Sequence, residues 1–193
     1  MKRLGITGGI GSGKSVVSEV FRCLGIPTYD ADSASKRLIT TQEPLIKALK
    51  SILGADIYTS EGLDKKRMAQ LIFNDVELLE KVNAVIHPAV FEDFKNWSLR
   101  QKAGIVACET AILFECGMNE QVDYAITVTA SLDTRINRCV KRDHASEEQI
   151  KARIANQMDQ EEKAKRSDYI VDNNGEMAIL PQIRKIIEEI NKA

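Results

Sequence analysis

Residues 8–15, GGIGSGKS, are the most informative part of this sequence about the expected fold. This stretch matches the pattern G-x-x-x-x-G-K-S/T, in which glycines let backbone N–H groups turn inward around an anion. An apolar run at residues 4–7 precedes it, and apolar residues at helical spacing follow it from Lys14 to Leu24, where Gly25 ends the pattern. A strand, a glycine-rich loop and a helix in this order predict a phosphate-binding loop, because the helix N-terminus adds partial positive charge beside the anion.

The polar residues of this loop have expected tasks. Lys14 reaches the β- and γ-phosphates of a nucleotide, and the Ser15 hydroxyl is a ligand for Mg²⁺. The residues expected to bind ATP are Gly9, Gly11, Ser12, Gly13, Lys14, Ser15 and Val16. The alternative, a glycine-rich turn beside a surface lysine, leaves the flanking strand and helix unexplained.

Further along the chain, short apolar runs alternate with longer helical patterns. Strands are expected at residues 4–7, 26–29, 105–108, 125–129 and 169–171, and a final helix carries Pro181 in or near its first turns. This alternation predicts an α/β fold, a five-stranded parallel sheet flanked by helices. The gap between the second and third strands is too long for one crossover. Residues 33–101 are therefore interpreted as a helical insertion, interrupted at Gly54, Gly62 and His87-Pro88, within a single domain of residues 1–193.

Composition narrows the class of protein. The 193 residues include 27 Lys and Arg against 28 Asp and Glu, a net charge of −1. General nucleic-acid or membrane-surface binding requires a basic excess, so neither partner is expected. The longest apolar runs are too short to span a bilayer, the N-terminus lacks the apolar core of a signal peptide, and the four cysteines show no C-x-x-C spacing. We expect a soluble cytoplasmic protein with free thiols; the sequence does not indicate its oligomeric state.

Two carboxylates, Asp30 and Asp32, follow the second predicted strand, at the sheet edge where open parallel sheets bind ligands. In an extended segment, side chains two residues apart point the same way, so one could hold a hydroxyl acceptor and the other water or Mg²⁺. The competing interpretation is an N-cap for the next helix. Beside the phosphate loop, catalysis is favoured for at least one of them. A carboxylate for the metal is expected from Asp30, Asp32 or Glu109.

A basic stretch precedes the fifth predicted strand. Arg135, Arg138 and Arg142 are spaced three and four residues apart, so they share a helix face. Such a face is usually solvated. The functional interpretation is a lid over residues 134–166 that brings guanidinium groups onto a transferring phosphoryl group, and the phosphate loop favours it.

Two other motifs are less specific. The stretch DNNG at residues 172–175 resembles the D-x-x-G of a GTPase switch, but it follows the fifth predicted strand. The N-K-x-D motif expected of a GTPase is missing, since the only Asn-Lys pair lies at residues 191–192. We therefore interpret DNNG as a turn. For His87, in IHPAV, chemistry alone favours a structural role over a contact with substrate.

Taken in order, the motifs GITGGIGSGKS, YDAD, IHPAV, ILFE, and RxxxR followed by RIANQ and EEK resemble the dephospho-coenzyme A kinase family. The match runs from residue 3 to about residue 175. The resemblance implies a P-loop kinase core, a helical coenzyme-binding insertion and a helical lid. It also implies transfer of the γ-phosphoryl group of ATP to the ribose 3′-hydroxyl of dephospho-coenzyme A, the last step of coenzyme A synthesis.

Carried over to this sequence, the resemblance implies a role for each matching residue. Lys14 and Ser15 hold phosphates and Mg²⁺. Asp32 is the base for the 3′-hydroxyl, with Asp30 beside it. The remaining assignments place Arg138 and Arg142 in the lid as catalytic residues and His87 in the acceptor-binding region.

Two positions depart from the family pattern: Ala111 where a proline is usual, and Lys36 where an arginine is common, with Arg37 next to it. Lysine cannot reproduce a planar bidentate contact. Two other functions stay open at this point. One is a nucleoside monophosphate or other small-metabolite kinase, and the other is a nucleotide-binding module without catalytic activity. A panel of phosphoryl acceptors would separate all three.

Overall fold

A computed structural model describes residues 1–73 and 75–192. Residues 74 and 193, which fall in the predicted insertion and the predicted domain, lie outside the described residues. The chain forms two compact units: Met1–Asp30 joined by the chain from Arg100 onward, and Ala31–Leu99. The first carries a parallel sheet, and the second is mainly helical.

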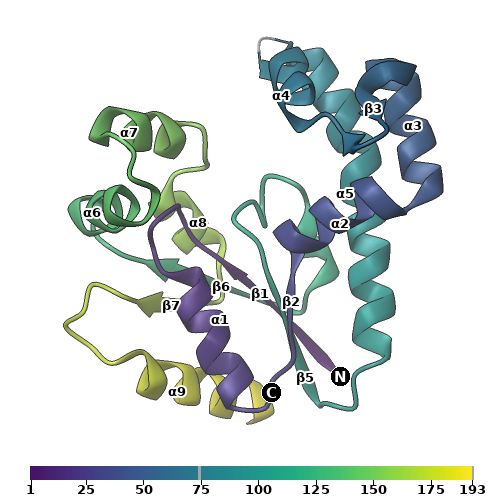
Figure 1. The fold of residues 1–193 in the computed structure, drawn as a ribbon. Coiled ribbons are helices and arrows are strands. Elements are labelled where there is room, and N and C mark those ends of the chain that lie inside the picture. The colour runs from purple at the N-terminus through teal and green to yellow at the C-terminus, as the bar shows by residue number, and fades with distance from the viewer. Residues whose placement is uncertain (74, 193) are drawn as a thin grey trace. The chain divides into compact units, whose positions relative to one another are not determined.

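The sheet of the first unit has five parallel strands in the order β2-β5-β1-β6-β7 (Figure 1). Their bounds are β1 Lys2–Thr7, β2 Thr28–Asp30, β5 Ile105–Glu109, β6 Tyr124–Thr129 and β7 Tyr169–Asp172. The prediction of a five-stranded parallel sheet is confirmed. The second strand begins at Thr28 instead of Ile26, because the Ile26 N–H bonds to Phe21 O at the end of the preceding helix and Pro27 has no N–H to donate.

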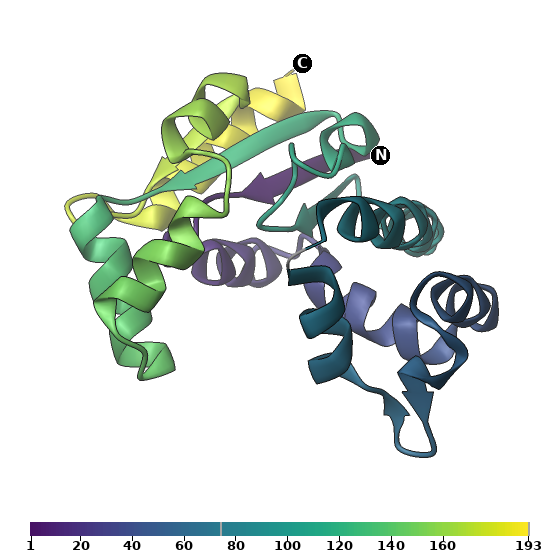
Figure 2. The same ribbon diagram turned by 90° about the horizontal axis from the view of Figure 1, so that it is seen from above.

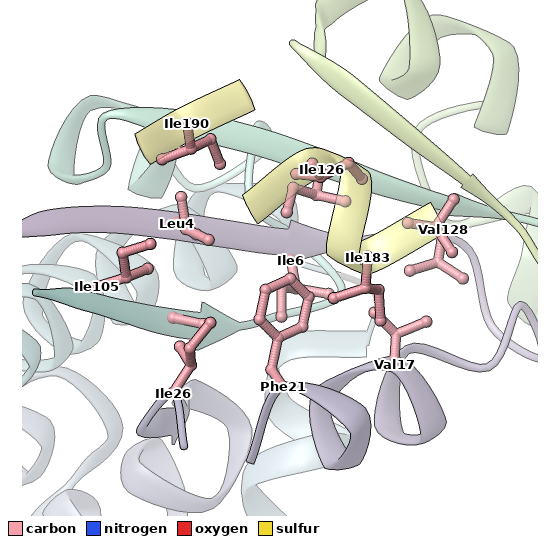
Figure 3. Packing of buried hydrophobic residues seen from close by; sticks show 13 residues of the cluster. Leu4, Ile6, Val17, Phe21, Ile26, Ile105, Ile126, Val128, Ile183 and Ile190 are labelled. Carbon is pink, nitrogen blue, oxygen red and sulfur yellow. The ribbon is translucent and has the colours of Figure 1, made fainter. Parts of the chain in front are cut away.

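Two helices, α1 (Lys14–Cys23) and α9 (Ile179–Lys192), cover one face of this sheet. Figure 3 shows Val17 and Phe21 of α1 and Ile183 of α9 meeting Ile6 and other inward-facing strand residues. Gly25 ends α1 as expected: it has φ +79°, and its N–H bonds to Arg22 O. This core fixes the start of α1, and with it the loop that leads into the helix.

The other face of the sheet is covered by the segment after β5, by η2 (Met118–Gln121) and by α8 (Gln160–Arg166). A Cβ at Gly5 of β1 would lie 2.8 Å from a Leu113 methyl group, so Leu113 packs directly on the strand. Helices α6 (Leu132–Asp143) and α7 (Glu147–Ala155) lie side by side (Figure 2). They share a small core of Ile136, Cys139 and Ile150, which Ile10 of the glycine-rich loop joins.

The second unit is built around α5 (Val76–Leu99), against which α2 (Ala31–Thr41), α3 (Glu43–Leu53) and α4 (Lys65–Phe73) pack. The expected interruption at His87-Pro88 is wrong, since Pro88 lies inside α5. Proline removes its own N–H bond, and the buried neighbours Ile86 and Val90 keep the turns around it packed. The structure also adds η1 (Ala55–Ile57) and a short hairpin, β3 (Tyr58–Thr59) with β4 (Gly62–Leu63).

Two further expectations from the sequence concern the cysteines and membrane-spanning helices. Cys23, Cys108, Cys116 and Cys139 are all free thiols. Among residues 1–73 and 75–192, we find no helix with the length and apolar character needed to cross a bilayer.

Candidate active site

The loop of residues 8–13 joins β1 to α1, as the sequence predicts. Gly11 and Gly13 have φ +79° and +95°, a conformation that favours glycine, and Gly13 is the N-cap of α1. A Cβ at Gly9 or Gly11 would collide with Arg135. The glycines are therefore required both by the backbone conformation and by the close approach of α6.

The loop and the first turn of α1 hold all the residues expected to bind ATP. The Lys14 ammonium donates to Gly8 O at 2.9 Å, so it lies against the loop. The Ser12 hydroxyl is fully buried and has no hydrogen-bond partner within the part of the chain that the structure describes. The first turn of α1 contains no acidic residue. The Lys14 ammonium and the unsatisfied Ser12 hydroxyl therefore both lie at the N-terminal end of α1.

Two of the expected carboxylates lie at the carboxyl ends of neighbouring strands. Asp30 of β2 and Glu109 of β5 are register partners. The Ser15 hydroxyl donates to Glu109 Oε1 at 3.4 Å, which brings Glu109 to the first turn of α1. Among the described residues there is no group of three or more Asp, Glu, His or Cys side chains that could hold a metal. A cation here would rely on a hydroxyl, a carboxylate and oxygens from outside the protein.

Asp32 does not lie in the extended segment that the sequence analysis assumed. Strand β2 ends at Asp30 and α2 starts at Ala31, so Asp32 is in the first turn of a helix. The expectation that Asp30 and Asp32 point the same way along a strand is therefore wrong, because a strand-like repeat of two does not continue into a helix. A carboxylate in the first turn also stabilises the helix through its dipole.

Three side chains from the stretch 134–166 hold the backbone of the glycine-rich loop. Arg135 is only 6% exposed, and its Nε donates to Ile10 O at 3.0 Å. Gln157 Oε1 accepts from Ile10 N at 2.9 Å, and Arg138 Nη1 donates to Ser12 O at 3.4 Å. Burial lowers the pKa of the Arg135 guanidinium. Sequence reasoning placed Arg135 on a basic helix face and Gln157 in the motif RIANQ, but it assigned neither to the loop.

The remaining two predicted residues, Arg142 and His87, have partners on their own helices. Arg142 makes two hydrogen bonds to Asp143, at 2.7 and 3.1 Å, and Arg153 reaches the same carboxylate at 2.9 Å. These guanidinium groups, Arg142 first, hold the pKa of Asp143 below its usual range. His87 belongs to α5 of the second unit, where burial lowers its pKa and its ring stacks on Phe91 at a centroid distance of 6.4 Å.

With this geometry in place, comparisons with known proteins identify the family. A family model described as dephospho-CoA kinase matches residues 3–178. The chain belongs to this family. The dephospho-CoA kinase of Bacteroides fragilis (strain YCH46) is 40% identical over 186 residues, which cover 96% of this chain and 91% of that protein.

Solved structures agree with this assignment. The crystal structure of TT1252 from Thermus thermophilus matches with a TM-score of 0.87 and 33% identity, covering 98% of this chain and 97% of that one. The dephospho-CoA kinase from Campylobacter jejuni matches with a TM-score of 0.66 and 26% identity, covering 100% and 98%. The predicted α/β P-loop kinase fold is confirmed.

One buried charge near this site was missed. Lys163 of α8 is fully buried and donates to Glu115 Oε1 at 2.7 Å and to Ala111 O at 2.5 Å. Glu115 also accepts from Met158 N at 3.1 Å. Ala111, where the family resemblance leads us to expect proline, contributes its carbonyl oxygen, which a proline also has. The motif ILFE places the Glu115 charge after three apolar residues, which was the available signal; EEK lies in a polar stretch and gave none.

At the second departure from the family pattern, the neighbouring arginine already has a partner. Arg37 of α2 donates to Asp93 Oδ2 of α5 at 2.6 Å, within the helical unit. Lys36 beside it is exposed. The Arg37–Asp93 ion pair therefore ties α2 to α5. Because its guanidinium is engaged there, Arg37 does not simply replace the arginine that the family resemblance leads us to expect at position 36.

Proposed function

We propose that this chain transfers the γ-phosphoryl group of ATP to the ribose 3′-hydroxyl of dephospho-coenzyme A, giving coenzyme A and ADP. The observation that carries the proposal is the loop of residues 8–13. It opens α1 with Lys14 and a buried, unpartnered Ser12 hydroxyl, in a chain whose family membership spans residues 3–178. The loop supports ATP as the phosphoryl donor, and the family membership supports dephospho-coenzyme A as the acceptor.

ATP binding is assigned to the loop and the first turn of α1. Backbone N–H groups of Gly9, Gly11 and Gly13 can donate to phosphate oxygens, and the Ser12 hydroxyl finds there the partner that it lacks within the protein. Lys14 supplies a full positive charge for the β- and γ-phosphates. Val16 follows in the first turn of α1, which adds the positive end of the helix dipole.

Mg²⁺ is assigned to Ser15, with Glu109 next to it. A hydroxyl and a carboxylate oxygen 3.4 Å apart are the hard oxygen donors that Mg²⁺ prefers, and Asp30 lies opposite Glu109 on the neighbouring strand. Mg²⁺ keeps several water and phosphate ligands, so a site with few protein ligands suits it. When bound with ATP, the ion neutralises charge on the phosphate oxygens.

Asp32 is assigned as the base, with Asp30 beside it in the sequence. The 3′-oxygen attacks the γ-phosphorus, the bond from that phosphorus to the bridging oxygen of ADP breaks, and the hydroxyl proton passes to Asp32. An aspartate is a weak base, but it can take the proton late, as the acceptor oxygen bonds phosphorus. Positioning of the two substrates and neutralisation of the phosphate charge then account for most of the rate acceleration.

The acceptor is assigned to the helical insertion, residues 33–101, with His87 as a contact. Residues 134–166 are assigned as the lid. Arg138 is the arginine best placed to stabilise the transferring phosphoryl group, because its guanidinium already lies at the Ser12 carbonyl. Arg142 can take part only after leaving Asp143. A cytoplasmic location is supported by the four free thiols, which a reducing compartment preserves.

An acceptor panel tests the proposal. Purified protein with ATP and Mg²⁺ is offered dephospho-coenzyme A, nucleoside monophosphates or small alcohols, and ADP release is followed. We expect rapid release with dephospho-coenzyme A alone, and mass spectrometry should find one added phosphoryl group on the ribose. Faster turnover of another acceptor would indicate a different kinase. ATP binding without acceptor-stimulated ADP release would indicate a binding module.

A further inference from the structure

The carbonyl of Ser12 accepts two hydrogen bonds from side chains outside the glycine-rich loop. Asn173 Nδ2 donates to Ser12 O at 2.7 Å, and Arg138 Nη1 donates to the same oxygen at 3.4 Å. The other terminal nitrogen of Arg138 donates to Asn173 O at 2.8 Å. The two donors are thus linked to each other as well as to the loop.

Asn173 is the first residue after β7, within the DNNG stretch that the sequence analysis interpreted as a turn. Its own N–H bonds to Thr129 O at 2.8 Å, at the end of β6, so the sheet fixes its backbone. A Cβ on Gly13 would collide with the Asn173 side-chain amide. Asn173 therefore lies as close to the loop as a glycine at position 13 allows.

These contacts determine the direction of one peptide group. A trans peptide is planar, and its C=O and N–H point in opposite directions. With Ser12 O directed toward Asn173 and Arg138, the Gly13 N–H is directed to the opposite side of the loop. A carbonyl that accepts hydrogen bonds also polarises the N–H of the same peptide group, which makes that N–H a better donor.

We propose that Asn173 is a positioning residue for phosphate binding: its amide holds the Ser12 carbonyl outward, so that the Gly13 N–H faces the bound phosphates. The identity of these phosphates as those of ATP rests on the proposed function. Substituting Asn173 separates the positioning of the Ser12 carbonyl from the electrostatic effect of Arg138, because the asparagine side chain is neutral. Removing its amide changes no charge at the site, whereas removing Arg138 would also remove a cation.

The test compares Asn173→Ala and Asn173→Asp with Asn174→Ala as the matched control. Asn174 belongs to the same turn, but its amide bonds to Ser131 N and to Asp172 and does not reach the phosphate loop. Calorimetry measures binding of tripolyphosphate, ADP and adenosine to each purified protein, and kinetics gives KM for ATP and for dephospho-coenzyme A. Thermal melting shows which variants are folded.

We expect Asn173→Ala to weaken tripolyphosphate and ADP binding about five- to tenfold, as the loss of one hydrogen bond predicts. Asn173→Asp keeps the shape but places a carboxylate against Ser12 O, so its loss should be larger. Adenosine binding and KM for dephospho-coenzyme A should stay unchanged. The ¹⁵N shift of Gly13 in the protein without nucleotide should also move, which a loss of stability alone would not cause.

Three results with the variants would overturn the inference. Weaker adenosine binding with unchanged tripolyphosphate binding would make Asn173 a contact of the base. Equal losses in Asn174→Ala would make the effect a general property of the turn. Unchanged tripolyphosphate affinity in a folded Asn173 variant would remove the role altogether. These measurements need no acceptor, so the acceptor panel can fail while this inference stands; wild-type protein that binds neither tripolyphosphate nor ADP would refute both.

Discussion

The ammonium group of Lys163 lies 2.7 Å from a carboxylate oxygen of Glu115, and the lysine side chain has no exposed surface. The same carboxylate accepts from Met158 N, between α7 and α8. Glu115 therefore joins the segment after β5 both to the connection between α7 and α8 and to α8 itself. A buried charge is stable only when it is paired. We therefore expect that breaking this contact lowers the free energy of unfolding.

Glu115→Ala should lower the free energy of unfolding by about 3–5 kcal/mol, because it leaves a buried ammonium unpaired. Lys163→Met should cost less, since the Glu115 side chain is 25% exposed and can be solvated. Urea unfolding measures both changes. Glu162→Ala is the control: it removes an exposed pair with Arg166 and should cost less than about 1 kcal/mol. Equal effects in all three variants would contradict the importance of burial.

Asp32→Asn should lower kcat about 10²- to 10⁴-fold, the range for loss of a general base, while ATP affinity stays within a factor of about two. Steady-state kinetics and calorimetry measure the two quantities. Asp133→Asn is the matched control, because Asp133 lies in the first turn of α6 as Asp32 lies in the first turn of α2. Normal turnover of Asp32→Asn would remove Asp32 from the mechanism.

Lys14→Ala should weaken ATP binding and lower kcat together, because its charge serves both the ground state and the developing charge of the transition state. A loss of at least about tenfold in each is expected. Lys185→Ala removes an exposed lysine of α9 and should change neither. The proposed role of the loop would be refuted by a Lys14→Ala enzyme with wild-type kinetics.

The stability of the protein should fall between pH 7.5 and pH 5.5, in part through His87. Burial lowers the pKa of His87 below the ordinary value of about 6.5, so the unfolded chain binds a proton more readily than the folded one. This contribution is fully present above pH 6.5 and is lost as the pH falls through the folded pKa. Urea unfolding of His87→Asn should therefore show a smaller decline with pH.

The chain has only one other histidine, His144, which is exposed at the end of α6 with φ +52°. His144→Asn is the matched control, since asparagine tolerates this backbone conformation. Its stability should follow the wild-type dependence on pH. An identical pH dependence in His87→Asn and the wild type would show that burial of His87 does not contribute.

Local patterns in the sequence were sufficient to predict the loop and most of the elements around it. Glycine spacing and one apolar face predicted the strand, the loop and α1, because these features depend on residues that are neighbours in the chain. The same reasoning failed where local signals were weak or misleading. Pro88 continues a helix because tertiary packing supports it. Asp32 lies in the first turn of a helix and does not extend a strand, and β3 and β4 are too short to show a period.

Short-range patterns in the chain were enough to predict that a phosphate loop opens α1 in a parallel α/β fold, because periodicity and glycine spacing act over a few residues. Which distant side chains hold that loop became visible only in the folded chain. Asn173 reaches Ser12 across 161 residues, and Lys163 reaches Glu115 across 48. Such contacts depend on the strand order β2-β5-β1-β6-β7, which brings the carboxyl ends of β1, β6 and β7 to one edge of the sheet. That order comes from packing of the whole unit, which no short stretch of sequence encodes.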